Sequence, residues 1–310
     1  MTSPSSPGPA SAGGSPRRPL TDAVPAPLLV LGGIVSVQLG AAVASGLIRE
    51  VGPLVTVGIR LTVAAAVTLL LARPGVRGRS RRDWLVVLAL GVSLGAMNVC
   101  FYGALGRMPL GIVTTIEFLG PLGLAAALSR RPAHVVAVIL ALAGVVAVSG
   151  ALQGGATAID GIGLLLTAGA GAGWVCYILA TRAVGARWRQ LDGLALAMTI
   201  GAVMVAPAAA ASWGGAAVTT GVLLAGAGVG VLSSVVPYSL ELLALRRLDT
   251  RVFGVLLSLE PAVAATAGFL VLGQVLSPVQ VAGIGLVVAA SVIVMREQAA
   301  EPAVEAAEIG

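Results

Sequence analysis

The sequence predicts an all-α polytopic membrane protein with ten transmembrane helices in two inverted five-helix repeats. Three observations support this prediction. Of the 310 residues, 57% are hydrophobic and only 10% are charged, whereas roughly 25% are charged in a soluble domain. Charged and turn residues divide the apolar sequence into segments of about 20 residues, the length that crosses a bilayer. A segment of the first half also recurs in the second half.

Each apolar segment is interpreted as one span, and each polar end as a tail. Residues 1–24 are rich in Ser, Pro, Gly and Ala, which predicts a disordered N-terminal tail, and residues 296–310 predict a mobile acidic tail. The first repeat then covers residues 25–152 and the second covers residues 153–295. The predicted spans are 27–48, 53–72, 84–105, 109–129, 133–151, 161–181, 191–212, 219–245, 252–272 and 279–295.

The basic residues predict the orientation of these spans. All 19 are arginine, since the sequence has no lysine. If the N-terminus is cytoplasmic, Arg49 and Arg107 lie outside, Arg60 lies within a span, and the other 16 lie on the cytoplasmic side. Cytoplasmic loops of membrane proteins carry an excess of basic residues. We therefore expect a multi-pass protein of the inner (cytoplasmic) membrane with both termini in the cytoplasm.

The composition also excludes several function classes. Without lysine, the chain has no Gly-x-x-x-x-Gly-Lys phosphate loop. One histidine and two cysteines are too few for a His/Cys metal cluster, so we expect neither a metal nor a cofactor. The pI near 10.6 does not indicate nucleic-acid binding, because the arginines lie between apolar segments. No span holds a Ser–His or paired-Asp site, so an intramembrane hydrolase is not expected.

The internal repeat predicts a transporter. Residues 104–121 align without a gap with residues 244–261, at an offset of 140. Because each half holds five predicted spans, the second copy has the opposite orientation in the membrane. Inverted repeats are typical of secondary transporters, which bind substrate between the halves. Identical pairs at this offset include Ala104 and Ala244, Leu105 and Leu245, Arg107 and Arg247, and Pro121 and Pro261.

Three charged residues lie deep within predicted spans. Arg60, Glu117 and Glu260 are seven or eight residues into their spans, roughly 10–12 Å from the membrane surface. Each charge costs about 2.5–3.5 kcal/mol at the centre of a helix in lipid. They therefore face a wet cavity or pair with one another, and a buried ion pair that locks the halves together is the structural alternative. One arginine cannot neutralise two glutamates, so at least one carboxylate is a candidate proton site.

Uncharged polar residues and prolines extend this candidate pathway. The polar side chains could line a substrate path or only join helices, and Glu241 could instead reach the cytoplasmic interface. The prolines are expected to kink their helices, since each frees a backbone carbonyl. The polar candidates are Gln38, Asn98, Tyr102, Tyr177, Tyr238 and Glu241, and the prolines are Pro121, Pro237 and Pro261.

Two segments resemble a known family. They are NVCFYGALGRMPLGIVTTIEFLGPLGLAAALSRRP (98–132) and VVPYSLELLALRRLDTRVFGVLLSLEPAVAATAGFLVLG (235–273). These segments resemble EamA-type transporters of the drug/metabolite transporter superfamily, closest to the threonine/homoserine exporters, and the resemblance covers about 25–296. It implies ten helices in two inverted repeats, a central cavity and efflux of amino acids or other small metabolites.

The resemblance also implies which residues match the family's polar positions, and it shows one departure. The matching positions are Arg60, Glu117 with Pro121, Glu241, and Glu260 with Pro261. Where the family usually has Gly-Glu, this chain has Gly273-Gln274. We expect an exporter of threonine/homoserine-like amino acids or related metabolites that works by proton antiport, with a small-molecule substrate and the lipid bilayer as its partners. The alternatives are a drug or other metabolite exporter on the same scaffold, and a membrane scaffold that transports nothing.

Overall fold

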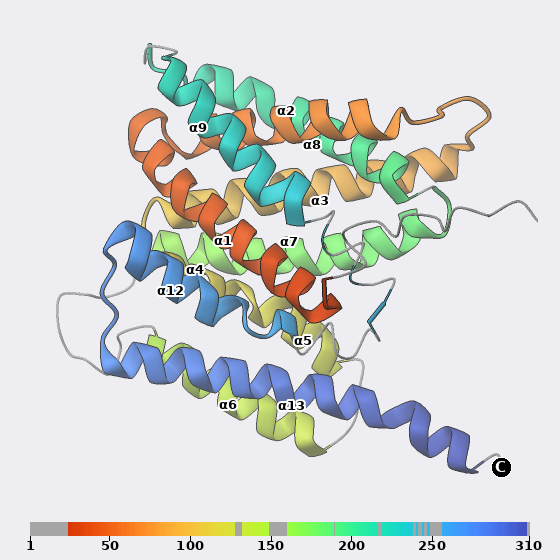
Figure 1. Ribbon diagram of the computed structural model, residues 1–310, viewed down its shortest axis with the longest axis vertical. Coiled ribbons are helices and arrows are strands. Elements are labelled where there is room, and N and C mark those ends of the chain that lie inside the picture. Colours follow the sequence, from red (N-terminus) through yellow and green to blue (C-terminus); the bar gives the residue numbers. More distant parts are fainter. Residues whose placement is uncertain are drawn as a thin grey trace, which may run out of the picture.

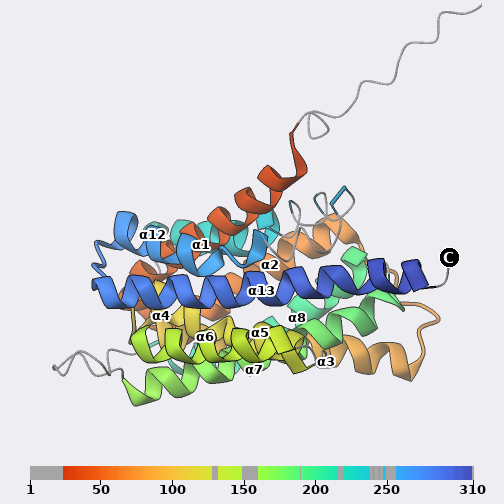
Figure 2. The same cartoon turned by 90° about the horizontal axis from the view of Figure 1, so that it is seen from below.

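The computed structural model describes residues 24–127, 132–148, 160–188, 190–215, 219–237, 240, 244, 247–248 and 256–308. In this part of the chain the secondary structure is helical, without a strand. The helices run side by side in both directions (Figure 1). In Figure 1, α6 (Pro132–Val148) and α13 (Pro278–Glu308) lie along the lower edge of the bundle, and Figure 2 views the bundle from that edge. The predicted N-terminal tail, except for Val24, lies outside the described residues.

Five helices are long and apolar enough to cross a membrane, as predicted. They begin and end close to the expected residues. Capping side chains define several of these ends: Ser80 and Asp83 form a reciprocal capping box before α3, and the Asp160 side chain accepts from the Gly163 backbone N–H before α7. The five helices are α1 (Ala26–Val51), α2 (Pro53–Ala72), α3 (Arg81–Leu105), α7 (Gly161–Gly185) and α8 (Gln190–Ala211).

Apart from the long α13, the remaining described helices are shorter, and three of the predicted spans are interrupted. The span predicted at 109–129 is two helices, separated at Phe118. In the span predicted at 219–245, the α-helix passes into a π-helix. Before α12, residues 258–259 form a turn. These helices are α4 (Leu110–Glu117), α5 (Leu119–Ala127), α6 (Pro132–Val148), α9 (Thr220–Gly230), the π-helix η3 (Val231–Val235), α12 (Glu260–Leu272) and α13 (Pro278–Glu308).

Proline chemistry explains two of these interruptions. Pro121 has no N–H for the Glu117 carbonyl four residues earlier, which favours the break between α4 and α5. Pro261 occupies the first turn of α12, where a proline is tolerated because that N–H has no helical partner. Glu260, predicted eight residues into its span, is the first residue of α12, where the helix dipole favours an acidic side chain.

The segment predicted as an acidic tail, 296–310, continues the last helix, and α13 extends to Glu308. Alanine and glutamate dominate this segment, and both have high helix propensity.

Glycines set the distances between the helices. A Cβ at Gly144 of α6 would lie 2.7 Å from the Gly283 carbonyl oxygen of α13, and a Cβ at Gly283 would lie equally close to the Gly144 carbonyl oxygen. A Cβ at Gly91 of α3 would lie 2.6 Å from a side-chain carbon of Ile200 on α8. In lipid, where no hydrophobic force drives helices together, such close approach provides the packing energy.

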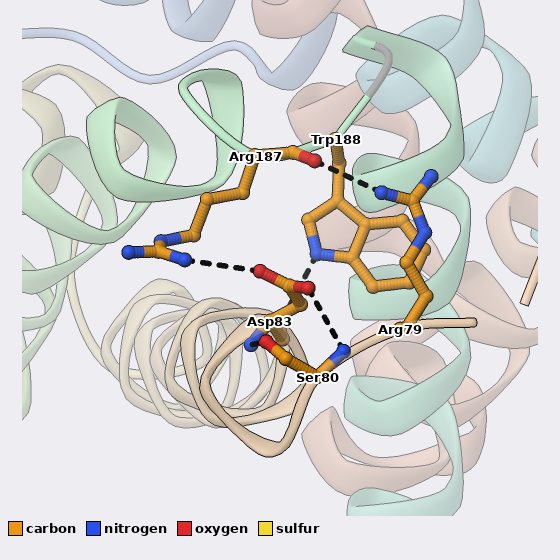
Figure 3. Close-up of polar contacts among 5 residues, drawn as sticks. All are labelled: Arg79, Ser80, Asp83, Arg187 and Trp188. Atoms are coloured by element: carbon orange, nitrogen blue, oxygen red, sulfur yellow. Dashed lines mark hydrogen bonds and ion pairs between the residues drawn. The ribbon is translucent and has the colours of Figure 1, made fainter.

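Polar contacts join the helices at both ends of the bundle. At one end, Arg107 pairs with Asp160 at 2.6 Å, and the Gly163 N–H together with the Arg107 guanidinium lowers the pKa of Asp160. At the other end, Arg187 pairs with Asp83 at 3.1 Å, and the Trp188 indole N–H donates to the Asp83 carbonyl oxygen (Figure 3). These contacts connect α3 to α7 at both ends of the helix pair.

The glycine contacts predict opposite effects of the same substitution at two positions of α13. Gly283→Ala should lower the melting temperature of the detergent-purified protein by several degrees, because the new Cβ meets the α6 backbone. Gly285→Ala should leave it unchanged or raise it, since no atom lies within 4 Å of that Cβ and alanine favours a helix by about 1 kcal/mol. Equal melting temperatures for the two variants would contradict the close packing of α6 on α13.

Candidate functional site

Arg60 connects the two halves of the bundle. Its Nη1 donates to Asn98 Oδ1 on α3, and its Nη2 donates to the backbone carbonyl of Ser233 on η3 at 3.0 Å. The guanidinium carbon also lies 5.3 Å from the centre of the Tyr102 ring, within the range of a cation–π interaction. Arg60 is therefore held by the dipoles of an amide and a carbonyl and by an aromatic face.

Local structure on each side presents these acceptors to Arg60. The Asn98 Nδ2 donates to the Leu94 carbonyl at 2.8 Å, which turns Oδ1 toward Arg60. On η3, the Leu232 carbonyl accepts from Ser36 Oγ of α1 at 2.7 Å, and the next carbonyl accepts from Arg60. π-Helical turns often mark functional sites. Here the wider turn coincides with carbonyls that side chains of α1 and α2 satisfy.

Several buried polar side-chain atoms of the interior have no hydrogen-bond partner in the part of the chain that the structure describes. Leaving such an atom unpaired costs about 1–3 kcal/mol, so the group is suited to hydrogen bonding with a polar molecule. Arg60, Tyr102 and Ser233 belong to one set of contacts, whereas Gln38 lies on α1 and Thr114 on α4. The atoms are Gln38 Oε1, Arg60 Nε, Tyr102 OH, Thr114 Oγ1, Ser233 Oγ and Ser234 Oγ.

Glu117 is the acidic group that the structure brings near Arg60. It is the last residue of α4 and only 7% exposed, and its charge interacts electrostatically with that of Arg60. A Cβ at Gly171 of α7 would lie 2.9 Å from the Glu117 carbonyl oxygen. The close contact with α7 therefore fixes the backbone of the glutamate at the point where α4 ends.

The other predicted residues take different positions. Glu260 is buried at the start of α12, which packs against α1 and α4. Tyr177 is half-buried on α7 and packs against the largest apolar cluster. Pro121 lies in α5, and Pro237 is buried in the helical residues that follow η3. Tyr238 and Glu241 lie outside the described residues.

Sequence reasoning missed the hydroxyl groups of this site. Thr114, Ser233 and Ser234 were not predicted, because isolated hydroxyls within spans commonly bond the preceding turn of their own helix. Ser93 does this, donating to the Ala89 carbonyl at 2.8 Å. A possible signal was the pair Ser233-Ser234, which stands between a glycine-rich stretch and Pro237.

Gln274, at the departure from the family pattern, has a defined structural contact. Its Oε1 accepts from the Leu110 N–H at 3.0 Å, at the first residue of α4. The N-cap residue of α4 is Pro109, which offers no capping side chain. Gln274 therefore caps α4 from the end of α12, a contact for which a carboxylate oxygen is equally suited.

The fold and this polar cluster define a class: a polytopic helical membrane protein with a charged, hydrogen-bonding interior. Residues 161–296 match the model of the EamA-like transporter family. The threonine/homoserine exporter RhtA of Escherichia coli (strain K12) is 37% identical over 264 residues, which cover 85% of this chain and 89% of that protein. RhtA of Salmonella typhimurium (strain SL1344) is 36% identical over the same shares. The chain belongs to the EamA-like transporter family.

The comparison with solved structures supports the fold alone. One crystal structure, described only as that of a protein, superposes with a TM-score of 0.60 at 20% identity, covering 86% of this chain and 96% of the other. The family match and the relatives, which are named as exporters, identify the protein as a membrane exporter of the EamA type.

The contacts of Arg60 predict the effect of removing it. Arg60→Ala should leave membrane insertion intact, because the substitution removes a charge that is costly in lipid. Export should fall about tenfold or more, since Asn98 and the Ser233 carbonyl lose a charged donor worth about 1.5–3 kcal/mol. Export rates normalised to the protein inserted in the membrane provide the measurement.

Arg49→Ala is the matched control, because Arg49 is an exposed arginine at the end of α1. It should export at the rate of the unsubstituted protein. Normal export by a well-inserted Arg60→Ala variant would show that Arg60 serves only packing.

Proposed function

We propose that the protein is a secondary active transporter that exports threonine/homoserine-like amino acids or related small metabolites across the inner membrane by proton antiport. The observation that carries this proposal is the buried cluster around Arg60, which joins α2 and α3 of the first half to η3 of the second. The similarity to threonine/homoserine exporters supports the substrate class.

The chemistry of the cluster suits a zwitterionic substrate. The unpaired Arg60 Nε–H and the Tyr102 hydroxyl are donors that a substrate carboxylate can accept from. The Gln38 amide oxygen is an acceptor, and the Glu117 carboxylate is a negative charge, so either suits a substrate amine. In this proposal the hydroxyls of Thr114, Ser233 and Ser234 add uncharged hydrogen bonds.

The proposal includes ten membrane helices in two inverted repeats, and the interrupted helices support it. The break after α4 falls at Phe118, and the turn before α12 includes Ser258. The separation of these two residues equals the predicted repeat offset of 140. A proline follows each by three residues, at Pro121 and Pro261. Interrupted helices at corresponding positions of two halves are typical of transporter binding sites.

The helix pairings support the same arrangement. In the proposed repeats α1 corresponds to α7, and α3 corresponds to α9 with η3. α3 packs on α7, and α1 packs on α9 and η3, so exchanging the two halves converts one pairing into the other. α2 packs on α8 and α6 packs on α13, and each of these pairings maps onto itself. Such a pattern is what a twofold relation between two five-helix halves produces.

The end contacts support the proposed topology, with both termini in the cytoplasm. Arg107 lies in the connection between the third and fourth predicted spans, and Asp160 lies in the connection between the fifth and sixth. We assign both connections to the outside, and the two residues pair with each other. Asp83 and Arg187 are both assigned to the cytoplasmic side, and they also pair. Arg247 Nη1, in a cytoplasmic connection, donates to the carbonyl of Val24 near the N-terminus at 3.4 Å. No contact in this set crosses between the two sides.

Proton coupling is assigned to the buried glutamates. Arg60 donates its hydrogen bonds to Asn98 and Ser233 and not to a carboxylate in these contacts, so Glu117 is available to bind a proton or a substrate amine in turn. Glu117 adjoins the break before α5, and Glu260 adjoins the turn before α12. Bending at these interruptions is the motion that we propose for alternating access.

Efflux assays test the proposed function. Cells that overproduce the protein and are loaded with single amino acids should release threonine or homoserine faster than cells with an empty vector. The Arg60→Ala variant should not. Resistance to cationic drugs without amino-acid release would favour the alternative drug exporter, and no flux of either kind in proteoliposomes would favour a scaffold.

Neutral substitutions test the coupling step. Glu117→Gln or Glu260→Gln keeps the hydrogen-bonding shape but cannot release a proton. We expect that at least one of them abolishes efflux driven by an imposed pH gradient in proteoliposomes, while substrate counterflow partly survives. Glu50→Gln, at an exposed glutamate near the end of α1, should behave like the unsubstituted protein. If both buried variants respond normally to the gradient, neither glutamate carries the proton.

A further inference from the structure

The connection between α2 and α3 concentrates positive charge at one end of the bundle. Residues 73–82 hold five arginines and no acidic residue. In Figure 1 this connection extends beyond the helices, at the end where α2 stops and α3 starts. The five residues are Arg73, Arg77, Arg79, Arg81 and Arg82.

The neighbouring polar groups engage only one of these arginines. Arg79 lies over the Trp188 ring at 4.1 Å and donates to the Arg187 carbonyl at 3.0 Å. Figure 3 shows that the carboxylate of Asp83, which directly follows these arginines in the sequence, already has two hydrogen-bond donors. One of its oxygens accepts from the Ser80 N–H and the other from Arg187.

The other four arginines are therefore uncompensated. Arg73, Arg77, Arg81 and Arg82 are exposed, and their side chains form no ion pair or hydrogen bond with a residue that the structure describes. The acidic C-terminal end of α13 lies at the opposite edge of the bundle in Figure 1. Among the residues that the structure describes, no acidic group neutralises these four charges.

An apolar surface continues directly from these charges. Arg81, Trp84, Leu85 and Leu88 follow one another at the three- and four-residue spacing that places side chains on one face of a helix. Trp84 is 40% exposed, Leu85 53% and Leu88 47%. Along α3, the surface passes from guanidinium groups to an indole and then to aliphatic side chains.

We propose that this surface, made of Arg73, Arg77, Arg81 and Arg82 with Trp84 and Leu85, binds anionic phospholipids. The order of groups matches a lipid: arginines meet the phosphate, tryptophan the interface and leucines the acyl chain. A soluble anion would use the arginines alone and would leave the adjoining apolar face without a role. This inference does not rest on the transported substrate.

Quenching of tryptophan fluorescence tests the proposal on the full chain in vesicles. Phosphatidylglycerol or phosphatidylcholine carrying bromine on the upper acyl chain is titrated into unlabelled lipid. An arginine near an anionic surface raises affinity about fivefold. Brominated phosphatidylglycerol should therefore quench at least about fivefold more effectively per mole than brominated phosphatidylcholine. The excess should disappear at about 0.5 M salt, which screens exposed charges. It should shrink in the Trp84→Phe variant, which removes the exposed reporter and leaves the buried Trp188.

Charge variants identify the arginines. Replacing all four by Gln should remove the preference, replacing all four by Lys should retain most of it, and Arg49→Gln at the other end of the bundle should not change it. Because salt and Trp84→Phe leave the four arginines in place, the test does not depend on folding of the Gln variant. Equal quenching by the two brominated lipids, or a preference that persists in high salt or in the folded Gln variant, would overturn the proposal.

Discussion

A guanidinium among apolar helices must have hydrogen-bond acceptors, and the arrangement of the interior depends on how Arg60 meets this requirement. Its acceptors come from two helices that the sequence separates widely, Asn98 on α3 and Ser233 on η3. Holding both at once brings the first and second halves of the chain together at a polar contact. Because these acceptors are dipoles, Arg60 meets its hydrogen-bonding requirement in these contacts without a carboxylate.

The close helix packing makes this contact possible. A Cβ at Gly40 would lie 2.2 Å from Ser233 Oγ, so the absence of a side chain on α1 lets η3 approach. A Cβ at Gly120 of α5 would lie 2.2 Å from the Gly171 carbonyl oxygen of α7, next to Glu117. Small residues thus stand directly beside the polar groups. Their role is to let backbones approach where hydrogen bonds and charges must meet, as well as to pack helices in lipid.

The interrupted helices and the Arg60 cluster lie on the same elements. α4 ends at Glu117, η3 presents the Ser233 carbonyl, and α12 begins at Glu260. In contrast, α3 and α7 are continuous and are joined at both ends by Arg107–Asp160 and Asp83–Arg187. This division supports a model in which α3 and α7 form a stable pair while the interrupted helices bend, consistent with the proposed export mechanism.

The sequence by itself determined the membrane class, the family resemblance and most helix positions, because hydrophobic segment length and arginine placement are local properties of the chain. α2 begins and ends at the predicted residues 53 and 72. The sequence also predicted Arg60 and Glu117 as site residues, since a charged residue deep in an apolar span can be recognised without a structure. Only the tertiary structure decided which groups Arg60 meets, that Glu260 starts a helix, and that Ser233 contributes a carbonyl. These features depend on backbone breaks and on contacts that Arg60 makes with residues 38 positions away, at Asn98, and 173 positions away, at Ser233, which no local pattern encodes.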